Sequence, residues 1–383
     1  MKPIKRDLIK PFGALALGVL TLAAMAQTHA ANILWVSDNG TTNTFSGPGD
    51  YPDGGWIRLL QSAGHNVNRY NGPDSQNTRL TAAELAAINT NDLIILGRAM
   101  NSAAFQNPQV IDWNVNITKP VLTINAYLVR ASRLGWCTGS TMIDDTPTRV
   151  TAVDLNDPAT AYIFSDVAME GNTTALPYDE AIYRNTSQIL EGPVTGGRIL
   201  ATANFIDLGG TPRQNIPIIM EWPAGTRVRG GADVLGSYRM YFAGSSREPA
   251  GGNILQHCVE NLTPTGEAMF LRAVEIALNS GVAPFDPTWP VGFKTQPQSV
   301  TVVENSLVTF SCVVTGAFPR TLQWQRKDPG GDWTDIPGAT SATYVMPSVT
   351  PADDGAQFRL FAQNNINSLF SEVATLTVLR DTT

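Results

Sequence analysis

Apolar runs and amphipathic segments alternate between residues 32 and 135. Three apolar runs and one mixed segment predict strands at residues 32–38, 65–70, 92–98 and 120–127. Between these strands, residues 55–64 and 81–89 have the apolar spacing of helices, and Thr81 with Glu84 matches a capping box. Buried strands separated by helices are typical of a parallel sheet that is covered on both faces. The pattern therefore predicts an α/β doubly wound, mostly parallel sheet.

The pattern changes after residue 147. Residues 147–245 hold strand-like segments, and residues 262–279 then form a strongly amphipathic helix whose predicted N-cap is Thr263. A Pro-rich stretch at residues 281–292 is typical of a linker. In residues 293–379 apolar and polar positions alternate, as they do in half-buried strands. The chain therefore divides into an α/β domain, a linker and an all-β domain.

The all-β segment resembles immunoglobulin domains of the I-set. Trp324 lies twelve residues after Cys312, and "ADDGAQFRLFAQN" matches the end of such a domain. The resemblance implies a β-sandwich whose core contains Cys312, Trp324, Phe358 and Leu360. Phe358 takes the position of the corner tyrosine and Leu360 that of the second cysteine. We therefore expect Cys312 to pack as a small apolar residue rather than to form the family's disulfide.

The first 30 residues have the pattern of a secretory signal peptide. A basic start is followed by a short apolar run and by small residues suited to cleavage. The alternative is a membrane anchor, but the run is shorter than the ~20 residues that span a bilayer. We therefore expect a secreted or cell-surface protein. The chain ends just past its last predicted strand, where modular proteins often continue into another domain.

Charge argues against nucleic acid as a partner. The chain has a net charge of −7, and removal of residues 1–30, with four basic residues and one acidic residue, would make it −10. An acidic surface repels nucleic acid and has no electrostatic attraction to anionic membranes. No later segment is long and apolar enough to span a bilayer. The sequence leaves the oligomeric state open.

Residues 31–280 resemble the class I glutamine amidotransferase-like group, which has a flavodoxin-like fold, and within it the ThuA-like branch. The resemblance rests on "ILWVSD", "LLQSAGHNV", "DLIILGR", "KPVLTINAYLV", "IIMEWPAGT", "YRMYFAG" and "LTPTGEAMFLRAVEIAL". In secreted bacterial proteins, members of this group often precede small β domains. The resemblance suggests a link to sugar metabolism but transfers no catalytic residue onto this chain.

Ligands of open parallel sheets bind beyond the carboxyl ends of the strands. The residues expected to line such a pocket are Ser37, Asp38, Asn39, Arg98, Asn125, Tyr127 and Trp222. We predict that residues 46–55 form a mobile loop over it. Four tryptophans, of which one or two would line the pocket, are candidates to stack on sugar rings: Trp56, Trp113, Trp136 and Trp222.

The position of the amidotransferase nucleophile holds no nucleophile. The turn after the fourth strand offers Asn125 or Ala126 where a Cys would be needed, and neither can attack a substrate. The weak catalytic candidates are Asp38, Glu221 and Tyr127, of which the two acids would divide the acid and base roles of a hydrolase. If the turn only shapes a pocket, Asn125→Ala should alter ligand binding and barely change stability.

The three cysteines provide no metal site. Neither Cys-x-x-Cys nor His-x-x-x-His occurs, so we expect no metal and no cofactor. In an oxidising compartment Cys137 and Cys258 are candidates for a disulfide. The alternative is that His257 and Cys258 form a reactive pair. His65, between a predicted helix and strand, is expected to be structural.

Three functions fit these observations. The first is a secreted modular binding or adhesion protein whose α/β domain holds an extracellular glycan or cell-surface polymer without turnover. The second is a hydrolase of carbohydrate or another polymer that uses strand-end carboxylates. The third is a structural component of the cell surface. Because fold does not imply function, the arrangement of the site must decide among them.

Overall fold

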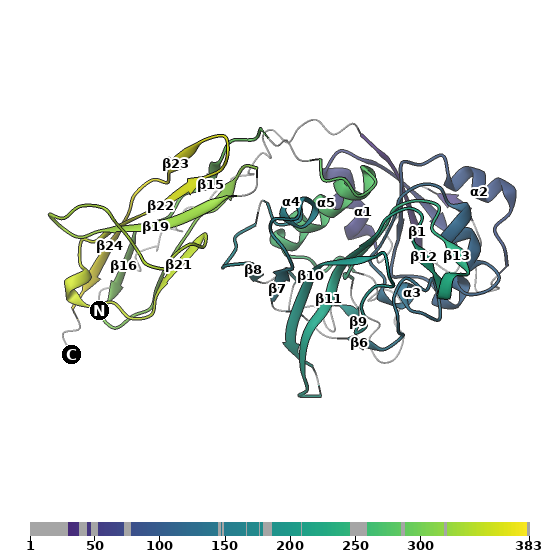
Figure 1. The fold of residues 1–383 in the computed structure, drawn as a ribbon, viewed down its shortest axis with the longest axis horizontal. Coiled ribbons are helices and arrows are strands. Elements are labelled where there is room, and N and C mark those ends of the chain that lie inside the picture. The colour runs from purple at the N-terminus through teal and green to yellow at the C-terminus, as the bar shows by residue number, and fades with distance from the viewer. Residues whose placement is uncertain are drawn as a thin grey trace, which may run out of the picture.

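The computed structural model describes most of the chain after residue 29. The described residues are 30–37, 44–46, 53–72, 78–144, 147, 149–165, 167–175, 177–178, 186–207, 209–245, 259–284, 288–317 and 320–380. The predicted signal peptide lies almost wholly outside them. Figure 1 shows a larger unit, which contains the helices and a long sheet, and a smaller unit of strands at the other end. Most of the regular structure is β-sheet, with few helices.

A ten-stranded sheet organises the larger unit, in the order β2-β3-β1-β4-β5-β14-β11-β10-β7-β8. Five adjacent strands within it run parallel, from β3 to β14. They are β1 (Asn32–Ser37), β3 (Asn66–Asn71), β4 (Leu93–Leu96), β5 (Val121–Thr123) and β14 (Arg239–Phe242). The four strands predicted before residue 127 are therefore present, each within a few residues of its expected position.

The rest of the sheet is antiparallel. It contains β2 (Thr44–Ser46), β7 (Arg149–Ala152), β8 (Thr173–Ala175), β10 (Arg198–Ile206) and β11 (Pro212–Trp222). Each of these strands pairs antiparallel with its neighbours. The expectation of a mostly parallel sheet is therefore wrong for the sheet as a whole. The physical reason is that β10 and β11 are joined by a hairpin, whereas parallel neighbours need a crossover connection.

Helices cover the sheet at several points. They are α1 (Gly54–Ser62), α2 (Ala82–Ile88), α3 (Ala126–Val129), α4 (Pro158–Ile163) and α5 (Pro264–Leu278). The Thr81–Glu84 capping box begins α2, and Thr263 caps α5, as predicted. Trp56 of α1 packs edge-on against Phe270 of α5, with ring centroids 4.9 Å apart. In Figure 1, α1, α4 and α5 lie along one side of the sheet.

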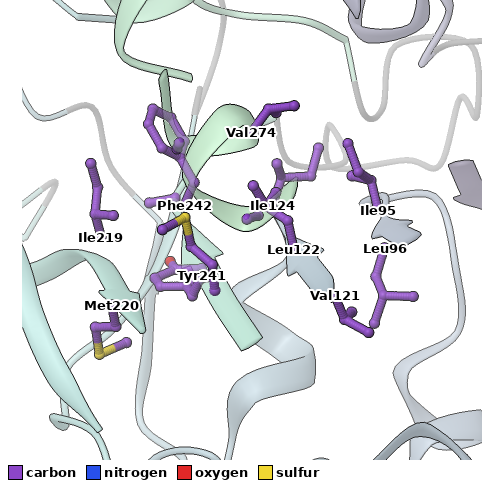
Figure 2. Close-up of a cluster of buried hydrophobic side chains, with 14 of the residues drawn as sticks. Ile95, Leu96, Val121, Leu122, Ile124, Ile219, Met220, Tyr241, Phe242 and Val274 are labelled. Atoms are coloured by element: carbon purple, nitrogen blue, oxygen red, sulfur yellow. The ribbon is translucent and has the colours of Figure 1, made fainter. Parts of the chain in front are cut away.

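The sheet's centre forms the hydrophobic core of this unit. β4 contributes Ile95 and Leu96, β5 contributes Leu122, and β14 contributes Tyr241 and Phe242, all at most 1% exposed. Figure 2 shows these side chains with Ile219 and Met220 of β11 beneath Val274 of α5. Burial of this much apolar surface is the main stabilising term, at about 25 cal/mol per Å².

Short elements complete the larger unit. They are β6 (Met142–Asp144), β9 (Ser187–Ile189), β12 (Arg227–Val228), β13 (Asp233–Val234), and the helical turns η1 (Ser102–Phe105), η2 (Asp112–Asn116) and η3 (Arg229–Gly231). β6 pairs with β9, and β12 pairs with β13, each antiparallel. None of the described helices is long and apolar enough to cross a membrane.

The smaller unit is a β-sandwich with its own core. Its elements are β15 (Gly292–Thr295), β16 (Val300–Val303), β17 (Val308–Ser311), β18 (Val313–Thr315), β19 (Thr321–Lys327), β20 (Thr334–Asp335), β21 (Thr343–Met346), η5 (Pro351–Asp353), β22 (Gln357–Gln363), β23 (Ser368–Phe370) and β24 (Ala374–Leu379). Cys312, Trp324, Phe358 and Leu360 are all buried in this core, and Cys312 carries a free thiol. Phe358 stacks on Phe310, with centroids 4.4 Å apart.

Candidate functional site

The carboxyl edge of the parallel strands holds several of the predicted pocket residues. Ser37 ends β1, Arg98 follows β4, and Asn125 follows β5. The register places Val36 beside Leu96 and Leu96 beside Thr123, so these strand ends are neighbours. Asp38 and Asn39 lie outside the described residues. The edge therefore collects residues that are far apart in the sequence, as the parallel pattern implied.

A buried charge cluster beside Ser37 was missed by the sequence analysis. Asp53 forms an ion pair with Arg69 of β3, and both side chains are fully buried. The Trp35 indole Nε1 donates to Asp53 Oδ2 at 2.6 Å, and Arg69 Nη1 donates to Ser37 Oγ at 3.2 Å. An arginine at an inward position of a strand was the available signal.

This cluster also bears on the end of the predicted loop, residues 46–55. Residues 47–52 lie outside the described part of the chain, but Asp53 occupies the N-cap position of α1 and is held by the side chains of Arg69 and Trp35. Gly54 and Gly55 already belong to α1. These contacts anchor the end of the loop. Breaking them would leave the Asp53 carboxylate unpaired in the interior, which would cost several kcal/mol.

The side chain of Asn125 stabilises the turn after β5. Its Oδ1 accepts a hydrogen bond from the backbone N–H of Tyr127 at 3.0 Å and so caps α3. Its Nδ2 donates to the backbone oxygen of Gly97 at 3.3 Å, which ties the turn to the loop after β4. The side chain is fully buried. Asn125 is therefore a structural cap, and its two hydrogen bonds lead us to expect that its removal lowers stability, contrary to the expectation from the sequence.

Tyr127 lies between two arginines. The guanidinium carbon of Arg98 is 4.5 Å from the centre of its ring, and that of Arg130 is 5.1 Å from it. Such contacts place cationic groups over the negative face of an aromatic ring. Arg98 is buried, whereas Tyr127 and Arg130 are half-buried. The predicted pocket residues Arg98 and Tyr127 are therefore neighbours, and they belong to a cationic rather than an acid-lined region.

Ser245, just after β14, lies at this edge and has an unusual backbone conformation. Its φ is 72°, in the left-handed region that β-carbon-bearing residues rarely adopt. Its hydroxyl is buried and makes no hydrogen bond to any residue that the structure describes, while its backbone N–H donates to Asn261 Oδ1 at 2.8 Å. A serine nucleophile needs a base within hydrogen-bond reach, and no described side chain provides one to this hydroxyl.

Glu221 and Trp222 lie at the opposite edge of the sheet. Because β11 runs antiparallel to β14, its carboxyl end pairs with the start of β14, where Trp222 is opposite Arg239. The expectation that Glu221 and Trp222 share a pocket with Ser37, Asn125 and Tyr127 is therefore wrong. It assumed that all strands of this sheet end at the same edge.

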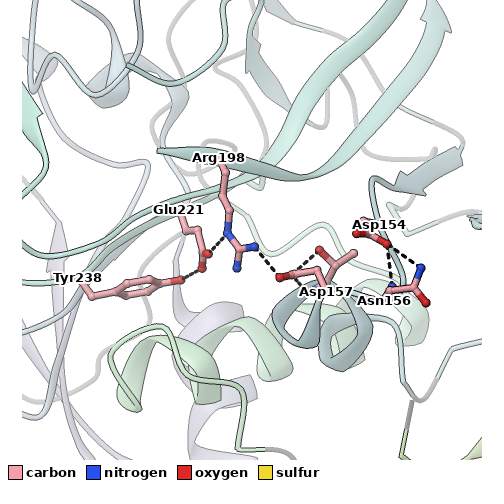
Figure 3. A network of polar contacts seen from close by, with 7 residues as sticks. Asp154, Asn156, Asp157, Arg198, Glu221 and Tyr238 are labelled. Carbon is pink, nitrogen blue, oxygen red and sulfur yellow. Dashed lines mark hydrogen bonds and ion pairs between the residues drawn. The ribbon is translucent and has the colours of Figure 1, made fainter. Parts of the chain in front are cut away.

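The carboxylate of Glu221 is fully engaged by its neighbours. Arg198 Nε donates to its Oε1 at 2.5 Å, and the Tyr238 hydroxyl donates to its Oε2 at 2.5 Å. Arg198 also binds Asp157, the N-cap of α4, as Figure 3 shows. Burial raises the pKa of Tyr238 well above its usual range, and the adjacent Glu221 charge adds to this rise. The network therefore stabilises the amino edge of the parallel strands.

None of the candidate tryptophans is exposed enough to stack on a sugar. Trp56, Trp113, Trp136 and Trp222 are each at most 1% exposed. Trp136 and Trp222 pack against one another, with ring centroids 5.3 Å apart. The expectation that one or two of them line a pocket is therefore wrong, because all four rings are buried in the hydrophobic core.

The cysteines form no disulfide within the described residues. Cys137 is a buried free thiol, so the predicted bond to Cys258 is not formed here; Cys258 and His257 lie outside the described part of the chain. Burial raises the pKa of the Cys137 thiol far above its usual range, and the Glu191 charge adds to this rise, which keeps the thiol unreactive. His65 is buried, and its Nδ1 accepts from the Ala31 N–H at 3.4 Å. No three metal-ligating side chains gather among the residues described.

Comparison with known proteins gives one short sequence match. No protein-family model matches this chain. Over 94 residues it is 35% identical to Endoglucanase C of Cellulomonas fimi, a stretch that makes up 24% of this chain and 8% of the endoglucanase. The chain thus matches less than a tenth of the length of that relative.

Solved structures that resemble part of this chain are immunoglobulin domains. A titin M10–obscurin-like 1 complex is 22% identical and covers 25% of this chain and 99% of its own, with a TM-score of 0.21. Titin Z1Z2 in complex with telethonin is 30% identical and covers 24% of this chain and 50% of its own, also with a TM-score of 0.21. Sidekick-1 domains 1–4 are 21% identical, cover 24% of each chain and have the same TM-score. The endoglucanase match and the two separate hydrophobic cores are compatible with a modular binding protein.

Proposed function

We propose that this chain is an exported modular protein that binds an extracellular polysaccharide without cleaving it. In this proposal residues 31–280 form a ThuA-like, amidotransferase-like domain of flavodoxin-like fold that holds the glycan. Residues 281–292 are a linker, and residues 293–379 are an immunoglobulin-like spacer. Residues 1–30 direct export to the cell surface or the medium.

The order of the parallel strands supports the fold assignment. Numbered by their order along the chain, the five parallel strands lie in the order second, first, third, fourth, fifth. That is the order of flavodoxin-like sheets, which bind ligands at the carboxyl edge. The carboxyl edge is also where Ser37, Arg98 and Asn125 gather in this chain.

The observation that carries the proposal is the role of Asn125. The turn at which amidotransferases need a nucleophile holds an amide that caps α3 and ties the β4 loop. This side chain cannot attack a substrate, and its hydrogen bonds maintain the shape of the turn. The short match to Endoglucanase C supports a polysaccharide as the ligand.

A hydrolase remains the second candidate because the matched relative is named as an endoglucanase. Its predicted acid pair required Asp38 and Glu221 to face one another across a pocket. Glu221 is at the other edge of the sheet from the end of β1, and its two oxygens bind Arg198 and Tyr238. These contacts count against a role as general acid or base.

The test uses purified residues 31–383 and insoluble polysaccharides, including cellulose. Loss of protein from solution measures binding, and a reducing-sugar assay measures cleavage. We expect binding without sugar release. Sugar release that disappears in Glu221→Gln or Ser245→Ala would establish a hydrolase instead. Failure to bind any polysaccharide, together with concentration-dependent self-assembly, would favour a structural surface component.

A further inference from the structure

A polar pocket lies beside Arg130, one of the two arginines that flank Tyr127. Its volume is about 380 Å³, and it is lined by Gln106, Asn107, Ala131, Ser132, Arg133 and Arg229. This volume is within the range of small-molecule sites. Two of the lining residues are cationic and none is acidic. The pocket is therefore a locally positive concavity in a protein whose net charge is −7.

The segment that builds the pocket has an unusual charge balance. Residues 98–140 contain four basic residues and one acidic residue, Asp112. That acidic residue forms an ion pair with Arg79, from outside the segment. Of these four basic residues, Arg133 lines the pocket and Arg130 lies close to Arg133, and such neighbouring positive charges attract anions over short distances.

Neutral oxygens hold Arg133 and Arg130 in position. Arg133 donates to Ser102 Oγ at 3.3 Å and to Gln106 Oε1 at 3.4 Å, and Arg130 donates to the same Ser102 Oγ at 3.0 Å. Within the described part of the chain, no carboxylate forms an ion pair with either arginine, and Nη2 of Arg133 makes no hydrogen bond. Both guanidinium groups are therefore ordered while their charges remain unneutralised.

Arg229 completes the pocket from the other side. Its Nη2 donates to Asn107 Oδ1 at 2.8 Å, and its Nη1 pairs with Asp233 Oδ2 at 3.0 Å.

Burial lowers the pKa of Arg130, and the nearby charges of Arg133 and Arg98 lower it further, while Tyr127 opposes them. An anion placed among these arginines would relieve their mutual repulsion. Planar guanidinium groups also match the two oxygens of a carboxylate or sulfate.

We propose that this pocket binds the carboxylate or sulfate groups of an acidic polysaccharide. The inference rests on the proposed function and specifies its ligand class. The contacts from Arg98 through Tyr127 to Arg130 and Ser102 connect the pocket with the carboxyl edge of the sheet. In this proposal the acidic groups of the polysaccharide bind to the arginines at the pocket.

The test compares three soluble polymers by equilibrium binding to residues 31–383. Polygalacturonate carries carboxylates, dextran sulfate carries sulfates, and dextran is neutral. We expect one or both anionic polymers to bind at least about tenfold more tightly than dextran. Removal of one charge-assisted contact in Arg133→Gln should weaken that binding about tenfold. Arg227→Gln is the matched control, because Arg227 is exposed, two residues from Arg229, and outside the pocket lining.

Equal losses in Arg133→Gln and Arg227→Gln, or no loss in either, would overturn the inference. Circular dichroism and thermal unfolding of both variants would show whether Arg133→Gln still folds. If it does not, Arg133→Lys keeps the charge but loses the planar fork, and we expect it to retain only part of the affinity.

Calorimetric titration with galacturonate and with galactose separates the two proposals. Galacturonate binding that is lost in Arg133→Gln would support the pocket even if the protein retained no polymer. Tight binding of dextran or cellulose with no preference for acidic polymers, and no galacturonate binding, would overturn the pocket and leave the proposed function standing.

Discussion

Two arginines in the larger unit have opposite surroundings, although both side chains are partly exposed. Arg198, at the amino edge of the parallel strands, binds the carboxylates of Glu221 and Asp157. Arg133, beside the pocket, is held by the oxygens of Ser102, Gln106 and Ser132. An arginine that is neutralised by two carboxylates stabilises the fold. An arginine that is ordered by neutral groups keeps its charge for a ligand.

The largest expected effect concerns the buried ion pair of Asp53 and Arg69, in which the arginine has a third kind of surroundings. Asp53→Ala would leave the Arg69 charge uncompensated in the interior, and we expect a loss of about 3–5 kcal/mol in the free energy of unfolding, measured in urea. The exposed pair of Arg149 and Glu170, each side chain 56% exposed, is the matched control. Glu170→Ala should cost less than about 1 kcal/mol. Similar losses in both variants would refute this contrast between buried and exposed pairs.

Glu221→Gln tests whether the amino-edge network is structural. The amide cannot accept from both Arg198 and Tyr238 with full charge, so we expect the protein to lose about 2 kcal/mol of stability. Binding of polysaccharide at a temperature well below unfolding should not change. A variant of normal stability that no longer bound its ligand would instead place Glu221 in a binding or catalytic site.

Asn125→Ala should destabilise the protein by about 1–2 kcal/mol, because it removes the cap of α3 and leaves the Tyr127 N–H without its acceptor. Asn125→Asp keeps the cap acceptor but replaces the donor to Gly97, so it should recover part of the loss. Urea unfolding of both variants measures this. Equal stability of Asn125→Ala and the wild type would mean that the cap contributes nothing.

Acid should weaken the amino edge through Asp157. Burial alone would raise the pKa of this carboxyl, but hydrogen bonds from Thr160 and Arg198 outweigh burial and lower it below the ordinary 3.8. The folded state thus binds a proton less readily than the unfolded chain. The stabilisation is present above about pH 4 and is lost as the pH falls through the lowered folded pKa. The free energy of unfolding of Asp157→Asn should therefore fall less steeply below pH 4 than that of the wild type.

The smallest expected effect is at Ser245. Glycine adopts a positive φ without strain, and the serine hydroxyl makes no hydrogen bond to the described part of the chain that would be lost. Ser245→Gly should therefore stabilise the protein by about 0.5–1 kcal/mol in thermal or urea unfolding. A clear loss of stability would show that the hydroxyl has a partner in the folded protein.

Local patterns predicted the elements well because each pattern reports a local cause. The Thr81–Glu84 box and Thr263 begin helices as expected, since capping depends on residues within one turn. The direction of β11 was not predictable in this way. Its apolar sequence fits a parallel or an antiparallel neighbour, and only the pairing with β14 shows that Glu221 ends at the opposite edge.

The candidate site could be predicted only in part for a related reason. Strand ends pointed to Ser37, Arg98, Asn125 and Tyr127, which do gather at the carboxyl edge or beside it. The pocket itself depends on Arg133 and Arg229, which are far apart in the sequence. Arg133 contacts Ser102 of η1, Arg229 belongs to η3, and both line the same pocket. Nothing in the local sequence distinguishes Arg133 from Arg198. The two arginines differ in their hydrogen-bond acceptors, and tertiary packing determines which acceptors lie beside each of them.

The most direct test of this account is the affinity of polygalacturonate and dextran sulfate for the wild type, Arg133→Gln and Glu221→Gln, measured side by side. The account predicts an affinity about tenfold weaker for Arg133→Gln and unchanged for Glu221→Gln. The reverse pattern, with binding lost in Glu221→Gln and intact in Arg133→Gln, would contradict it.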